Sequence, residues 1–258
     1  MRKKSLILSG FAVIMGVFGA FLRWLQNTNT YDAETHLFTS HSPWNYAVAL
    51  FAVLFVALLL VWVNKQKQLH FDSAFPEVYS NTIPFVSIAA YIIGALVAAG
   101  GILTIYRSVI ISKSAFDLIL GFFSFVSAAG LISFLVSVGK PNKGGKSGVF
   151  GAVSTVFFLC FWLIASYKSS ADEPAIWYFA PRLLSICATI LAFYFNAGFV
   201  FNKPKPLAAL YFNLLGTFLC VAVLADNYPL GEQLMTFGFA AAMTILSFSQ
   251  VNSAKIDN

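Results

Sequence analysis

Five charged residues lie in or beside the ends of long apolar segments, where ionisable side chains are costly and mark candidate functional sites. They are Arg23, Asp117, Arg182, Asp226 and Glu232. A guanidinium group held between helices can bind an anion through two parallel hydrogen bonds, and nearby carboxylates would neutralise it or set its charge selectivity. These residues therefore predict an outward-facing pocket for a small anionic solute. The alternative is a ring of inter-helix ion pairs that closes the bundle.

Two apolar segments also carry polar side chains at helical spacing along most of their length. The residues are Ser185, Thr189, Asn196, Gln233 and Thr244. Because lipid does not reward polar atoms, we expect these two faces to point into a helical bundle. They predict either a polar cavity or tight packing with hydrogen bonds between helices.

Other chemistry has few candidates. His36 and His41 are five residues apart in a polar segment with Asp32 and Glu34, but this spacing fits no metal motif. The three cysteines lie in apolar segments and are expected to pack as small apolar residues. We therefore expect no metal, no cofactor and no catalytic residue, and an intramembrane enzyme that uses carboxylates ranks last.

Eight apolar segments of about 18–25 residues position these side chains, and each is long enough for a helix to cross a bilayer. Hydrophobic residues form 59% of the 258-residue chain and charged residues only 10%, whereas a soluble domain carries about 25% charge. The fold class is therefore an all-α, polytopic transmembrane bundle in a single integral membrane domain, residues 1–258. The predicted spans are 5–26, 44–63, 83–106, 115–138, 149–167, 177–201, 206–225 and 232–250.

The distribution of Lys and Arg predicts the orientation. Eleven of the sixteen lie on the side that holds both termini, and this side is cytoplasmic by the positive-inside rule. The loop at 27–43 is then outside. The same asymmetry accounts for the net charge of +6, so a nucleic-acid partner is not expected.

Two segments that align without gaps are consistent with an internal repeat. Residues 123–134 align with residues 237–248, at an offset of 114 positions. A duplication of four helices would give two halves of the same orientation, a 4+4 parallel repeat. Chance similarity between apolar sequences is the alternative.

One stretch carries a resemblance to a known family. Its residues are Leu22-Arg23-Trp24-Leu25-Gln26, Thr30-Tyr31-Asp32-Ala33-Glu34-Thr35 and Ser42-Pro43-Trp44. The stretch resembles a segment of an uncharacterised family of multi-pass membrane proteins of Gram-positive bacteria. The resemblance implies a bacterial plasma membrane and gives weight to the first outer loop, and it brings no activity with it.

Two functions compete on these observations. The first is a small-solute transporter or solute-binding membrane protein, which predicts discontinuous helices or a mid-membrane cavity. The second is an accessory or sensory membrane subunit, which predicts a closed bundle with an apolar face for a partner. The expected partners are the lipid bilayer, a small anionic solute in the first case, and another protein or a second copy in the second.

The predicted topology can be tested by cysteine labelling in intact cells. A membrane-impermeant maleimide should react with a cysteine at position 39 and leave one at position 143 unlabelled, because the first lies in the 27–43 loop and the second in a Lys-rich inner loop. The reverse pattern would show that the orientation is wrong.

Overall fold

The computed structural model describes residues 2–32, 37–39, 42–65, 69–70, 83–138, 144–170, 176–201, 203–253 and 255–256. Within these residues, eight helices are long and apolar enough to cross a membrane, so the chain is a multi-pass integral membrane protein with an all-α fold. The helices are α1 (Arg2–Thr30), α2 (Pro43–Lys65), α3 (Ile83–Arg107), α4 (Ala115–Val138), α5 (Gly144–Ser169), α6 (Ile176–Val200), α7 (Pro206–Val223) and α8 (Leu230–Ser253).

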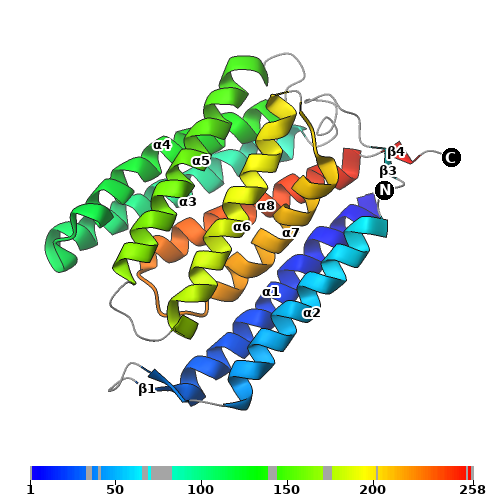
Figure 1. Cartoon of the computed structure of the whole chain (residues 1–258). Coiled ribbons are helices and arrows are strands. Elements are labelled where there is room, and N and C mark those ends of the chain that lie inside the picture. Colours follow the sequence, from blue (N-terminus) through cyan, green and yellow to red (C-terminus); the bar gives the residue numbers. More distant parts are fainter. Residues whose placement is uncertain are drawn as a thin grey trace.

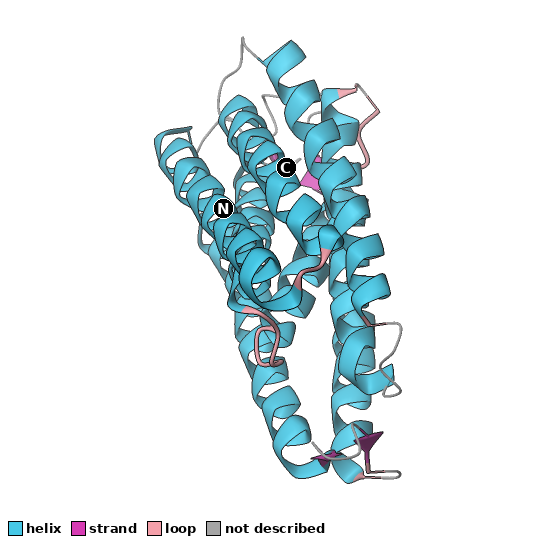
Figure 2. Cartoon of the chain, turned by 90° about the vertical axis from the view of Figure 1, so that its left-hand side faces the viewer, coloured by secondary structure: helices cyan, strands magenta, loops and turns pink. Residues whose placement is uncertain are grey.

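Short elements lie near the helix ends (Figure 2). Strand β1 (Tyr31–Asp32) pairs with β2 (Leu37–Phe38) in antiparallel fashion just after α1. Strand β3 (Leu69–His70) pairs with β4 (Lys255–Ile256), which brings a segment after α8 beside the connection between α2 and α3. A π-helical turn, η3 (Ser108–Ser112), continues α3 before Lys113 adopts a left-handed conformation with φ of 50°.

Several helix ends differ from the predicted spans; α5, for example, begins at Gly144 rather than at residue 149. Helix α1 continues to Thr30 rather than ending at residue 26, and the hydroxyls of Thr28 and Thr30 donate hydrogen bonds back to the carbonyls of Trp24 and Gln26. Helix α3 is extended by η3 to Ser112. The α1 extension is polar, so a hydropathy criterion does not find it, whereas η3 is largely apolar but lies beyond the charged Arg107, where the predicted span ends.

The helices form one bundle in which α3, α4 and α5 are successive neighbours and α6 links α5 to α7 (Figure 1). Helix α8 packs against α3, α7 and α1, while α1 and α2 run together along one side of the bundle. The larger apolar core lies among α3–α8, and a second core joins α1 and α2 to α7. Both ends of the chain lie at the same end of the bundle in Figure 1.

The helix packing does not repeat between the two halves. In a 4+4 duplication, α3 would correspond to α7 and α4 would correspond to α8. The interface between α3 and α8 would then recur as an interface between α7 and α4. Helices α3 and α8 pack extensively, whereas the described parts of α4 and α7 share no comparable interface. The similarity between residues 123–134 and 237–248 therefore does not correspond to a shared packing environment, and the duplication stays a prediction.

Glycines set the closest helix crossings. A Cβ atom on Gly231 of α8 would lie 2.6 Å from the carbonyl oxygen of Gly100 on α3, and one on Gly121 of α4 would lie 2.9 Å from that of Gly101. Small residues let membrane helices approach until their backbones touch, which replaces the hydrophobic driving force that lipid removes. The bundle is held in part by these contacts.

Gly151 of α5 tests this packing. A Cβ atom there would lie 2.5 Å from the Gly130 carbonyl oxygen and 2.7 Å from the Phe134 nitrogen, both of them backbone atoms of α4. We expect Gly151→Ala to lower the free energy of unfolding by about 1–3 kcal/mol, as overpacking does. Thermal unfolding in detergent measures this. The control is Gly10→Ala on α1, where a Cβ atom meets nothing within 4 Å; an equal loss in both variants would contradict the explanation.

Candidate functional site

A buried ion pair joins α1 to the connection between α7 and α8. Arg23 Nε lies 2.7 Å from Asp226 Oδ1, and both residues are only 2% exposed. The same guanidinium donates through Nη1 to Gln26 Oε1 at 2.7 Å and through Nη2 to the carbonyl oxygen of Trp177 at 2.5 Å. Arg23 therefore contacts Gln26 on its own helix and links α1 to the start of α6 and to the α7–α8 connection.

A second ion pair lies between α6 and α8. Arg182 Nη2 pairs with Glu232 Oε2, and Trp162 of α5 donates a hydrogen bond to the same oxygen at 3.4 Å. The Arg182 guanidinium also lies over the ring of Tyr228, 4.6 Å from its centre, in a cation–π contact. Glu232 is in the first turn of α8, where the helix dipole favours a negative charge.

The two pairs form one group, which we call the charged cluster: Arg23, Arg182, Asp226 and Glu232. Gln233, next to Glu232, donates from Nε2 to the carbonyl oxygen of Asp226 at 3.0 Å. Burial raises the pKa of Asp226, while the charges of Arg23 and Arg182 and the hydrogen bonds from Asn27 and Arg23 oppose that rise. The cluster holds two cations and two anions, so it is neutral as a whole when all four are ionised.

A chain of contacts links the charged cluster to the segment that follows α1. Gln26 Nε2 donates to Asn45 Oδ1 on α2 at 2.8 Å, and Asn45 Nδ2 donates to the carbonyl oxygen of Thr39 at 3.2 Å. The ring of Phe38 in β2 lies 5.9 Å from the Arg23 guanidinium carbon. The predicted outer loop therefore contacts the cluster both directly and through two amide side chains.

Four of the five predicted ligand-site residues are thus brought together, and Asp117 is not among them. Asp117 lies in the first turn of α4, where its Oδ2 accepts a hydrogen bond from Ser112 Oγ of η3 at 3.1 Å. Its backbone nitrogen also lies 3.4 Å from Ser114 Oγ. This carboxylate serves the turn between α3 and α4.

The polar residues of α6 and α8 are engaged in helix packing. Thr189 Oγ1 donates to the Ser185 carbonyl oxygen, and Ser185 Oγ donates to that of Arg182, each at 2.7 Å. Asn196 Nδ2 donates to Asn213 Oδ1 of α7 at 2.7 Å. The hydroxyls of Thr244 and Thr217 lie 3.4 Å apart, and Gln233 contacts Asp226 as described above. The Ser185 and Thr189 hydrogen bonds stay within α6, whereas Asn196 and Thr244 make the polar contacts with α7.

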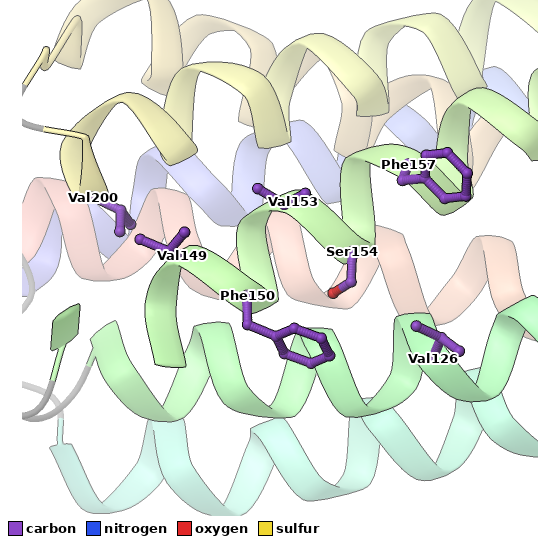
Figure 3. A pocket seen from close by; sticks show the side chains of 7 residues that line it. All are labelled: Val126, Val149, Phe150, Val153, Ser154, Phe157 and Val200. Atoms are coloured by element: carbon purple, nitrogen blue, oxygen red, sulfur yellow. The ribbon is translucent and has the colours of Figure 1, made fainter. Parts of the chain in front are cut away.

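A groove with a volume of about 700 Å³ lies elsewhere, along α5 between α4 and α6 (Figure 3). Its lining residues are Val126, Val149, Phe150, Val153, Ser154, Phe157 and Val200. Phe150, Val153 and Phe157 are each more than half exposed on the outside of the bundle. The groove is therefore apolar and faces the lipid, and it is separate from the charged cluster.

Sequence reasoning missed three polar neighbours of the cluster. Gln26 and Asn27 follow Arg23 at the three- and four-residue spacing of one helix face. Gln26 lies within the predicted span 5–26, and a longer α1 would have added Asn27. Asn45 lies in the first turn of an otherwise apolar helix, and a polar residue in such a helix indicates a position that faces the bundle. The backbone carbonyl of Trp177, by contrast, has no sequence signal.

The possible metal ligands fall largely outside the described residues. Glu34, His36 and His41 are among the residues that the structure leaves undescribed, while Asp32 lies exposed in β1. Among the described residues, no three His, Cys, Asp or Glu side chains gather as a metal site would require. The absence of a metal stays a prediction.

The fold and the site together define a multi-pass integral membrane protein with a buried, charge-neutral cluster at the end of the bundle where α1 ends. Searches for similar proteins found no matching family model, no matching curated protein and no matching solved structure.

The Arg23–Asp226 pair predicts non-additive mutational effects. Arg23→Leu leaves the buried Asp226 without its cation and should cost about 3–5 kcal/mol of unfolding free energy. The double variant Arg23→Leu/Asp226→Leu should recover most of that loss, since no buried charge is left unpaired. Thermal or denaturant unfolding of the purified variants measures the cycle. Additive losses would show that the two side chains do not act as a pair.

Proposed function

We propose that this protein is a sensory subunit of a bacterial plasma membrane, in which the charged cluster couples the outer loop to the packing of the helices. One observation carries the proposal: an unbroken series of contacts from Thr39 through Asn45 and Gln26 to Arg23 and Asp226. A change in the outer loop at one end of this series reaches the α7–α8 connection at the other.

The chemistry of the cluster supports a switching role over a purely stabilising one. Buried ion pairs contribute little net stability compared with apolar residues of the same size, because the charges lose their hydration. Apolar residues would therefore close the bundle at least as well as these four buried charges. Local changes of charge can act as switches when they alter the pairing of such a network. Ionisable residues in or near membrane spans are functional candidates for the same reason.

The solute-binding alternative requires a free cation for the anion. Both guanidinium groups are occupied by carboxylates, so a solute would have to displace Asp226 or Glu232. The polar groups of α6 and α8 are occupied by hydrogen bonds within their own helices and by contacts with α7, so they serve helix packing in this conformation.

Gln26→Leu tests the coupling because it breaks the contact series without removing a charge. We expect spin labels at positions 39 and 227, on a cysteine-free background in nanodiscs, to show a broader or longer distance distribution in this variant. The substitution cuts the Gln26–Asn45 link between Arg23 and Thr39, so the hydrogen bonds of Thr39 with Thr30 and Asn45 are kept but no longer lead to Arg23. Asn29→Leu is the control, because Asn29 is exposed and its hydrogen bonds stay within α1.

Two results would overturn the proposal. One is an unchanged distance distribution in Gln26→Leu. The other is a stabilisation of the wild-type protein by a small anion such as phosphate, sulfate or a carboxylate that is lost in folded Arg182→Gln. A ligand at a hundred times its Kd stabilises by about 2.7 kcal/mol, which a thermal shift detects readily.

A further inference from the structure

Two oxygen atoms beside the Arg23–Asp226 pair have no hydrogen-bond donor. Asp226 Oδ2 and Asn27 Oδ1 are both buried and unpartnered, although each belongs to a group that is otherwise engaged. Asn27 Nδ2 donates to Asp226 Oδ1 at 2.9 Å, so the amide and the carboxylate are already joined by one hydrogen bond. A buried acceptor without a donor costs about 1–3 kcal/mol, and two such atoms on a bonded pair of groups call for an explanation.

A single proton would satisfy both atoms. A carboxylic acid and an amide form a two-bond pair in which the amide N–H donates to one carboxyl oxygen and the acid O–H donates to the amide oxygen. The first of these bonds is present. The second needs only a proton on Asp226 Oδ2, which is then donated to Asn27 Oδ1.

We propose that Asp226 and Asn27 form a proton-binding site, and that the proton it takes up from the outer side is the signal that releases Arg23 from its ion pair. This inference rests on the proposed sensory function and names its stimulus. On protonation, a proton from water bonds to Asp226 Oδ2 and the carboxylate loses its charge. Arg23 then keeps its contacts with Gln26 and Trp177 but loses its anion.

The surrounding charges are compatible with this site. Arg23 on α1 and Arg182 on α6 favour the ionised carboxylate. Glu232 on α8 and Tyr228 in the same connection are the other titratable groups of this region, and α7 carries no charged residue. One proton can bridge the two unpartnered oxygen atoms, whereas hard metal cations such as Ca²⁺ and Mg²⁺ take six or more oxygen ligands. Burial outweighs the arginines, because the pKa of Asp226 is raised overall.

The direction of the pKa shift gives the pH dependence. The folded protein holds the Asp226 proton to a higher pH than the unfolded chain, whose pKa is near 3.8. Stability from this group is therefore fully present below pH 3.8 and is lost as the pH rises to the folded pKa. Asp226→Asn cannot titrate, so its stability relative to the wild-type protein should increase as the pH rises through this window.

Infrared spectroscopy of the full chain in nanodiscs tests the proton directly. An acid titration from about pH 9 to about pH 4 should produce a protonated-carboxyl band that shifts on ¹³C-aspartate labelling and disappears in Asp226→Asn. Asp117→Asn is the matched control and should retain the band. Asn27→Leu should move the band to higher frequency, because the acid loses its hydrogen-bonded partner. Arg23→Gln should raise the midpoint by about one pH unit or more.

The alternative occupant is an ordered water molecule that donates to both oxygen atoms. In that case no aspartate band would depend on Asp226, and the proton site would be overturned even if Gln26→Leu alters the outer loop. If Asp226→Asn does not fold, the test uses proteins that keep Asp226. An isotope-shifted carboxyl band that moves to higher frequency in Asn27→Leu then supports the proton site, and a band that does not respond overturns it. A band that is lost in Asp117→Asn instead would also overturn the assignment.

Discussion

The contact between Arg23 and Asp226 is the constraint on which the arrangement of α1 depends. Neither charge is tolerable alone in a buried position, so α1 must approach the α7–α8 connection closely enough for the two groups to meet. Glycines on the same side of α1 permit this approach: Cβ atoms on Gly16 and Gly19 would lie 2.8 Å from Val221 Cβ and 3.2 Å from Ala222 Cβ. The small residues of α1 and its arginine therefore serve one purpose, which is to seat this helix against α7.

Polar contacts along α6, α7 and α8 contribute in a different way. Hydrogen bonds between membrane helices are worth on average about 0.6 kcal/mol each, so the Asn196–Asn213 and Thr217–Thr244 contacts add modestly to stability. Their main effect is to fix the rotation and register of the helices, since a one-residue shift would leave both asparagines unpaired in an apolar core. The packed aromatic and aliphatic core and the glycine crossings supply most of the remaining cohesion.

The sequence predicts much of this structure, and the failures have physical causes. Apolar length alone locates all eight helices, because a bilayer demands about twenty apolar residues from each. It does not locate the last turn of α1, whose residues are polar, or the η3 turn, which is apolar but follows the charged Arg107. The meeting of Arg23, Arg182, Asp226 and Glu232 follows from their shared membrane surface and inward faces. The separation of Asp117 depends on which helices are neighbours in space, and that information is not in the pattern of any single helix.

The two carboxylates of the charged cluster have different environments, and this difference decides which one can act as a switch. Glu232 lies in the first turn of α8, accepts a hydrogen bond from Trp162 and pairs with Arg182, so several fixed partners stabilise its anion. Asp226 lies in a connection rather than at a helix start, and one of its oxygen atoms has no donor. Two nearby carboxyl groups can have different roles when their surroundings differ in this way. Glu232 is suited to hold α6 and α8 together permanently, whereas Asp226 can change its charge and thereby release α1.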